Sequence, residues 1–220
     1  MPGLAGLFPV DTKNFPTALV NASLSSTSLM FGPGGAVTVG PFSIATAQPN
    51  ILGSDLSTGI SLGQGTGTAA PTPDFIVPGF GNASIVNGAG PDLAVWEAGT
   101  PSEPFRIRVS TDGGATFSAF HEYTTAATTP NVNTSGFTSN IGFVELGDFG
   151  IAANAKVDAV WIEGLFTNIG GSGPDILAAG ILNSGPPTGN VPGTPGAPDG
   201  GSSLFLLGTA LAGLRLIRRS

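Results

Sequence analysis

Three acidic residues lie at the ends of apolar, strand-length segments and could supply oxygen ligands to a calcium ion. Asp92 and Glu97 flank the apolar run 93–96, and Asp175 begins the apolar segment 175–182. Ca²⁺ takes about six to eight oxygen ligands, so acids at strand ends are candidates for such a site. The alternative is structural, because Asp92 and Asp175 each follow Gly-Pro and can bond N–H groups of their own turns. The sequence leaves both interpretations open.

Catalytic groups are sparse. His121 is the single histidine, and no nucleophile elbow lies near it, so we expect a solvated strand histidine rather than a Ser-His-Asp site. Paired carboxylates for glycoside hydrolysis could come from several glutamates, but the sequence gives no separation between them. These are Glu97, Glu103, Glu122, Glu145 and Glu163. Trp96 and Trp161 could stack on a sugar, although both lie in apolar runs that favour core packing.

A separate pattern predicts a hairpin. Ser110, Asp112, Gly114, Thr116 and Phe117 fit Ser-x-Asp-x-Gly-x-Thr-Phe, the Asp box of sialidase-like propellers. We expect Asp112 to accept turn N–H groups while Gly113 and Gly114 adopt positive φ. The pattern occurs once and no repeat of about 40–50 residues is present, which argues against a propeller.

The elements that must position these residues are short and β-like. Phe105, Ile107 and Val109 alternate with Arg106 and Arg108, as in a half-buried antiparallel strand. Within the strand-length segment 156–164, residues 157–162 are apolar on both faces apart from Asp158, which suits a central strand. Further strand-length segments are 36–44, 91–99, 115–123, 141–146 and 175–182. The sequence predicts an all-β protein, with residues 15–182 forming an antiparallel two-sheet β-sandwich of jelly-roll type.

Composition narrows the function classes. The chain has 220 residues, no cysteine and a net charge of −7, which excludes structural disulfides and thiol catalysis. Arg215, Arg218 and Arg219 account for three of the 7 basic residues, and removing them and Asp199 leaves 4 basic against 13 acidic residues. Such a body repels phosphate backbones, so we expect no nucleic-acid partner.

The last part of the chain changes character. Residues 183–196 are rich in Pro and Gly and predict a semi-extended linker. The apolar run 204–214 follows, and Arg218 and Arg219 lie beyond it. The run is shorter than the roughly 20 residues of a full bilayer span. A C-terminal helix docked on the domain is therefore the alternative to a short transmembrane helix.

The order of these elements in residues 197–220 resembles the PEP-CTERM sorting signal of Gram-negative bacteria, in its Val-Pro-Asp-Gly-Gly-Ser variant. Pro198, Asp199, Gly200, Gly201 and Ser202 match, and Ala197 replaces the usual Val. The resemblance implies a tail that is recognised and cut by a membrane-embedded exosortase, with Arg218 and Arg219 on the cytoplasmic side. It also implies transient anchoring in the inner membrane and later release to the surface or the extracellular matrix.

Family members carry an N-terminal export signal, which residues 1–14 do not provide. The apolar run 4–10 has no basic residue before it and no small-x-small cleavage site after it. We therefore expect the export signal upstream of Met1.

Segments of the body also resemble exported bacterial β-sandwich domains that carry sorting tails. Asp92, Leu93, Val95 and Glu97 match a Gly-x-Asp-Leu-x-Val-x-Glu strand, and Val109, Ser110, Asp112 and Gly113 match a Val-Ser-x-Asp-Gly hairpin. A late Gly-Phe-Asp-Leu-Asp-Ala-Val strand is only partly kept. Gly173, Asp175 and Ala178 match it, whereas Pro174 and Leu177 depart from it. Leu177 removes one potential calcium ligand.

Together these observations predict a non-catalytic exported protein of the cell surface or of an exopolysaccharide matrix. The alternatives are a secreted lectin-like module, with or without Ca²⁺, and a carbohydrate-active enzyme. Beyond that Ca²⁺, no cofactor is expected. The expected partners are an exosortase-type enzyme, the inner membrane and exopolysaccharide.

Overall fold

The computed structural model describes residues 15–32, 36–53, 56–63, 73–81, 83–99, 103–127, 133–134, 137–165 and 173–186. The N-terminal segment 1–14, most of the linker and the whole tail 197–220 lie outside these residues. The expected C-terminal helix and every residue of the sorting signal therefore fall outside the described part. Those predictions stay predictions.

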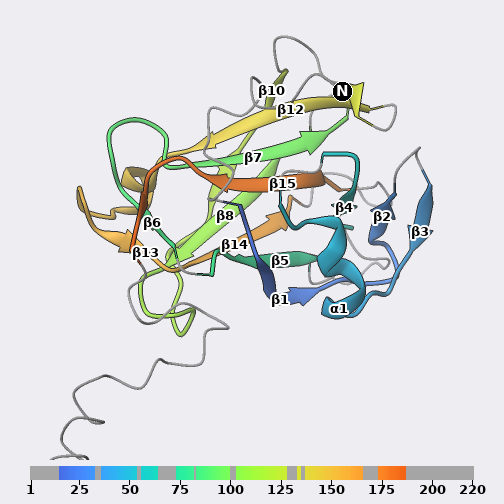
Figure 1. The fold of residues 1–220 in the computed structure, drawn as a ribbon, viewed down its shortest axis with the longest axis horizontal. Helices are drawn as coiled ribbons and strands as arrows, with labels where there is room; N and C mark the ends of the chain where they lie inside the picture. The colour runs from blue at the N-terminus through green and yellow to red at the C-terminus, as the bar shows by residue number, and fades with distance from the viewer. Residues whose placement is uncertain are drawn as a thin grey trace, which may run out of the picture.

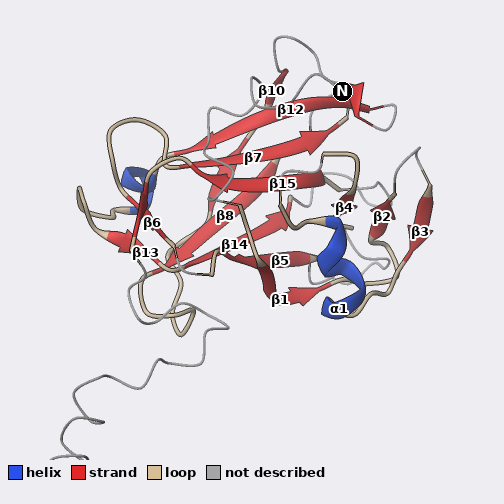
Figure 2. Ribbon diagram, in the orientation of Figure 1, coloured by secondary structure: helices blue, strands red, loops and turns tan. Residues whose placement is uncertain are grey.

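The regular secondary structure of the described chain is almost all β, as Figure 2 shows, with one short α-helix and two short 3-10 helices among the strands and loops. The first strands are β1 (Ala18–Ser23), β2 (Leu29–Phe31), β3 (Val37–Val39), β4 (Gly59–Ser61), β5 (Phe75–Gly79), β6 (Ser84–Val86), β7 (Leu93–Ala98) and β8 (Phe105–Ser110). The later strands are β9 (His121–Tyr123), β10 (Ala126–Ala127), β11 (Asn133–Thr134), β12 (Phe137–Val144), β13 (Lys156–Val157), β14 (Ala159–Gly164), β15 (Asp175–Ile181) and β16 (Ser184–Gly185). The helices are α1 (Ile44–Ala47), η4 (Gln48–Asn50) and η5 (Leu146–Phe149).

Two large antiparallel sheets form the two layers of the fold. One has the strand order β1-β5-β14-β8-β9, and the other has the order β10-β12-β7-β15-β4-β2-β3 with β11 paired to β12. Figure 1 shows β12, β7 and β15 side by side in one layer and β8, β14 and β5 in the other. A small third sheet of three strands, β13-β6-β16, lies at one end of these two layers, at the left in Figure 1. The predicted all-β, antiparallel fold is confirmed, while this third sheet was not predicted.

The space between the two large sheets holds the main core. Ile107 of β8 and Ile162 of β14 belong to the same buried cluster as Val95 of β7 and Ile176 of β15. Since each of these strands places alternate side chains on opposite faces, the inward positions of both sheets fill one apolar layer. That shared layer is what makes the two sheets a sandwich.

The larger sheet is also covered on its outer face. Ala94, Trp96 and Ala98 of β7 pack with Phe15 and with the loop residue Leu56 in a second cluster. Every residue of β7 is buried, including Glu97. Both faces of β7 are therefore inside the protein, and a polar side chain on it must find its partners there.

The strand predictions were confirmed in part. β8 has the predicted alternation of buried and partly buried residues, and β14 is the central strand of its sheet. Segment 156–164 is wrong as one strand, because the chain is divided at Asp158 into β13 and β14. Segment 36–44 is also shorter than predicted, since Ser43 accepts a hydrogen bond from the Thr46 N–H and begins α1. Paired structure continues beyond Leu182 to β16.

Candidate functional site

Asp92 is buried at the beginning of β7 and both of its carboxylate oxygens are satisfied. Oδ1 accepts from the Gly88 N–H at 2.8 Å and from Asn183 Nδ2 at 2.8 Å. Oδ2 accepts from the Leu146 N–H at 2.9 Å. The Gly88 bond lies within the turn of Asp92 itself, as the structural alternative expected, and the other two bonds tie that turn to Leu146 and to Asn183.

Glu97 is buried at the other end of the same strand and is less well satisfied. Its Oε2 accepts from Thr125 Oγ1 at 3.1 Å and from Asn140 Nδ2 at 2.9 Å. Its Oε1 is buried and has no hydrogen-bond partner within the described chain. Burial raises the pKa of Glu97, and the bonds from Asn140 and Thr125 offset only part of that rise.

Two further carboxyl groups near Glu97 have raised pKa values. Burial raises the pKa of Asp175 to about 7, and the charges of Glu103 and Glu97 add to the rise. Burial also raises the pKa of Glu103 to about 7, with a further contribution from Glu97. Asp175 Oδ1 is a second buried oxygen without a partner among described residues. We call Glu97, Glu103 and Asp175 the carboxyl cluster.

The predicted calcium ligands do not converge. Asp92 and Glu97 are five positions apart along an extended strand, which corresponds to about 16 Å. Glu97 pairs with Ile176 on the core face, whereas Asp175 pairs with Ala98, whose side chain lies on the outer face. Among the described residues, no group of three acidic or histidine side chains could hold a metal ion. One ion therefore cannot contact Asp92, Glu97 and Asp175 together.

The hairpin predicted from the Asp box is confirmed. Gly113 and Gly114 have φ of 73° and 87°, and Asp112 Oδ1 accepts from the Thr116 N–H at 2.9 Å. Ser110 Oγ donates to Asp112 Oδ1 at 2.6 Å and accepts from the Gly114 N–H at 2.8 Å. Hydrogen bonds from Ser110 and Thr116 lower the pKa of Asp112 to about 2. All of this side chain's described bonds hold its own turn.

Arginines and aromatic rings gather on the outer face of the five-stranded sheet. Arg106 forms an ion pair with Glu163, while the Arg108 guanidinium carbon lies 3.9 Å from the centroid of the Trp161 ring. Arg108 also lies 4.9 Å from the Phe117 ring and 4.8 Å from the Phe120 ring. The alternation in β8 predicted that both arginines lie on one face of the strand. The aromatic rings that contact them were not predicted from the sequence.

Neither tryptophan offers a free face to a sugar. Trp96 is 1% exposed and packs against Phe15. Trp161 stacks on Phe75 with ring centroids 3.6 Å apart. A ring and a guanidinium at such short separations cannot share one face of the indole, so Phe75 and Arg108 cover both faces of Trp161. Core packing, the preferred interpretation, holds for Trp96, and Trp161 is part of a surface cluster instead.

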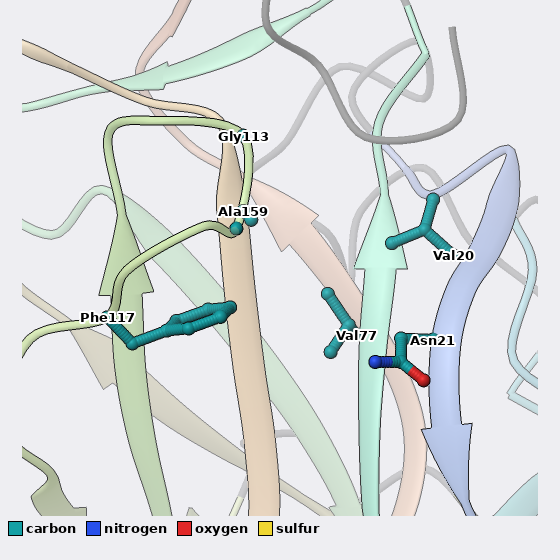
Figure 3. Close-up of a pocket in the computed structure, with 7 residues that line it drawn as sticks. Val20, Asn21, Val77, Gly113, Phe117 and Ala159 are labelled. Carbon is teal, nitrogen blue, oxygen red and sulfur yellow. The ribbon is translucent and has the colours of Figure 1, made fainter.

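A small pocket lies beside this cluster. It has a volume of about 200 Å³ and is lined by Val20, Asn21, Val77, Gly113, Gly114, Phe117 and Ala159. Figure 3 shows the Phe117 ring and the Asn21 amide on opposite sides of Val77. The Asp-box loop forms one wall, and β1 forms the other. The geometry of the Asp-box turn therefore also sets the width of this pocket.

The remaining catalytic candidates are dispersed. His121 lies on β9, the edge strand of the smaller of the two large sheets. Its ring is 4.7 Å from the ring of Phe149 in η5. Glu163 is bonded by Arg106 and by Trp161 Nε1. Glu122 is exposed opposite Arg106, and Glu145 lies beside Asp92, which helps to raise the pKa of Glu145. Only Glu97 and Glu103 of the five glutamates are brought together, through the carboxyl cluster.

The comparisons give this chain no family. No family model matches it, and neither a curated protein nor a solved structure does. The site must therefore be interpreted from its own geometry.

Within the described residues, no helix is long and apolar enough to cross a membrane. The predicted membrane segment 204–214 lies outside that part of the chain. The described residues contain two groupings that could bind a ligand. One is the buried carboxyl cluster at the end of β7, and the other is the set of arginines and aromatic rings on the outer face of the five-stranded sheet.

Proposed function

We propose that this protein is a non-catalytic, exported β-sandwich of the cell surface or the extracellular matrix. In this proposal a C-terminal sorting signal holds it in the inner membrane, and an exosortase-type enzyme then cuts and releases it. The observation that carries the proposal is the order of elements in residues 183–220: a Pro and Gly linker, Pro198-Asp199-Gly200-Gly201-Ser202, an apolar run and Arg218-Arg219.

The described body is compatible with release from a tail. The last described strand, β16, is held by pairing to β6. Just beyond it, the Pro186 carbonyl accepts from Ser84 Oγ at 2.9 Å and from Lys156 Nζ at 2.8 Å. These bonds fasten the end of the body, so the linker after it can be cut without removing a strand.

Each part of the tail has its own physical role in the proposal. Moving guanidinium groups through hydrocarbon is costly, so Arg218 and Arg219 keep the end of the chain in the cytoplasm. Pro198 and the two glycines keep the backbone out of a helix and accessible to a processing enzyme. The linker provides reach between the membrane and the body.

The experiment separates anchoring from cutting in the native cell. Arg218→Glu with Arg219→Glu is expected to misplace the tail, whereas Pro198→Ala with Asp199→Ala is expected to leave the protein anchored and uncut. The matched control is Thr188→Ala with Asn190→Ala in the linker, which should change neither. Membrane fractionation and the mobility of the chain on gels give the readout. Normal release of both tail variants would overturn the proposal.

A further inference from the structure

The outer face of the five-stranded sheet carries a groove that the proposed function does not use. Its floor is Val77 of β5 and Ala159 of β14, and its walls are Phe117 of the Asp-box loop and Asn21 of β1 (Figure 3). Arg108 does not line the pocket itself, but its guanidinium carbon lies 4.9 Å from the ring of Phe117, which does, and we include it in the set. We call this set of residues the outer groove.

Arg108 is the unusual member of the groove. Arg106, two residues away on β8, is neutralised by Glu163. Arg108 instead lies against aromatic rings, and its Nε is buried without a hydrogen-bond partner within the described chain. Its register neighbour on β14 is Trp161 rather than an acid. No carboxylate of the described residues forms an ion pair with Arg108, and because its Nε is buried while the side chain is partly exposed, a partner from outside would meet its terminal N–H groups.

The chemistry of such a group selects its ligand. A guanidinium presents parallel N–H donors that match a carboxylate, and aromatic rings on its faces hold that fork in one orientation. The adjoining pocket, of about 200 Å³, has room for a single small ring. Its lining is uncharged, and the exposed Asn21 amide can both donate to and accept from hydroxyl groups.

We propose that the outer groove binds a uronate unit of an acidic polysaccharide. The carboxylate of the sugar bonds to Arg108, and its ring lies over Val77 and Ala159 with hydroxyls at Asn21. Asp112 and Asp158 lie at the Gly113 side of the pocket, so they repel the carboxylate from that side and favour its placement at Arg108. This inference rests on the proposed function only for the source of the ligand, since an exported matrix protein meets such chains.

The test measures binding of the full chain to polygalacturonate by calorimetry, with dextran as the neutral polymer and polyglutamate as the non-sugar polyanion. Binding to polygalacturonate alone is expected. Arg108→Gln should weaken it by about tenfold or more, the usual cost of losing a charge-assisted pair. Arg108→Lys, which keeps the charge and loses the fork, should recover only part of it. Lys156→Gln is the matched control, because it removes one positive charge on a different sheet and should leave binding unchanged.

If the Arg108 variants do not fold, Asn21→Ala provides a second test. Because Asn21 is exposed, this substitution should weaken binding of polygalacturonate without lowering the melting temperature. Failure of wild type to bind polygalacturonate would overturn the inference, and so would equal binding to dextran or to polyglutamate. Binding unaffected by Arg108→Gln would do the same. None of these results bears on the tail, whose own variants test the proposed function separately.

Discussion

The two ends of β7 carry one buried acid each, and the protein treats them in opposite ways. Asp92 accepts hydrogen bonds on both oxygens from the Gly88 and Leu146 N–H groups and from Asn183. Glu97 accepts bonds on one oxygen only, from Thr125 and Asn140. Its other oxygen has no partner among described residues, and two more carboxyl groups with raised pKa values lie near it.

The difference shows that burial alone does not tell what an acid does. At the Asp92 end, two main-chain N–H groups and the Asn183 amide donate to the carboxylate. At the Glu97 end burial raises the pKa, and the hydrogen bonds to the carboxylate offset only part of that rise. The first acid connects three parts of the chain, while the second belongs to a cluster of carboxyl groups with raised pKa values.

The largest expected effect is at the Asp92 end. Asp92→Ala removes the acceptor of the Gly88 and Leu146 N–H groups and leaves that of Leu146 buried without a partner. We expect the free energy of unfolding to fall by about 3–5 kcal/mol in urea denaturation. Asp112→Ala is the control, because that acid bonds only its own exposed turn and its loss should cost clearly less than the loss of Asp92. Equal effects of the two substitutions would contradict the role given to Asp92.

Glu97→Gln should act in the opposite direction. The amide oxygen of the glutamine can still accept from Asn140 and Thr125, while the buried charge is removed. At pH 8 we expect the free energy of unfolding to rise by roughly 1–3 kcal/mol. The gain should shrink towards pH 4, where Glu97 is protonated in both states. A loss of stability at pH 8 would show that the ionised carboxylate is well accommodated after all.

The carboxyl cluster also predicts the pH dependence of stability. The pKa values of Asp175 and Glu103 are raised to about 7 from 3.8 and 4.5. The folded protein therefore keeps protons that the unfolded chain releases, and stability should fall as pH rises from about 4 to 7. Thermal melts across this range measure the slope, and Glu103→Gln with Asp175→Asn should flatten it.

Asp112 adds the opposite dependence at lower pH. Its pKa is lowered to about 2 from 3.8, so its contribution is present above about pH 4 and is lost as pH falls towards 2. Maximum stability is thus expected near pH 4 to 5. A maximum above pH 7 would contradict the role given to the cluster, and unchanged stability between pH 4 and pH 2 would contradict the role given to this turn.

The smallest expected effect is that of calcium. The carboxylates of Asp92, Glu97 and Asp175 lie at two ends and on two faces of one sheet, so they cannot form a common site. Added millimolar Ca²⁺ should leave the melting temperature unchanged, and a chelator should have no effect. A rise that Asp175→Asn abolishes would show that Ca²⁺ binds at the Glu97 end.

The local features of this fold could be predicted from the sequence, and the long-range ones could not. The turn at Asp112 depends on residues within a few positions of one another, and its glycines, hydroxyls and acid define its geometry directly. The alternation of β8 likewise follows from its own residues. In contrast, the partners of Glu97 come from Thr125 and Asn140, and only the register of β7 with β12 brings Asn140 to it.

The positions of the calcium candidates also depend on long-range strand pairing. Asp175 and Glu97 looked equivalent as acids at strand ends, but antiparallel pairing places Asp175 opposite Ala98. A shift of one position changes the face of a strand residue. Glu103 was missed as a member of the cluster because it lies beyond β7 in a loop, where no periodicity indicates direction.

The central claim is that the tail is a sorting signal that is cut in the native cell. Intact-mass measurement of the protein released from the native cell surface tests it most directly. The account predicts a species that ends near Gly201 and lacks the apolar run and Arg218-Arg219. A surface protein whose mass includes every residue to Ser220 would contradict the claim and would favour the docked-helix interpretation of residues 204–214.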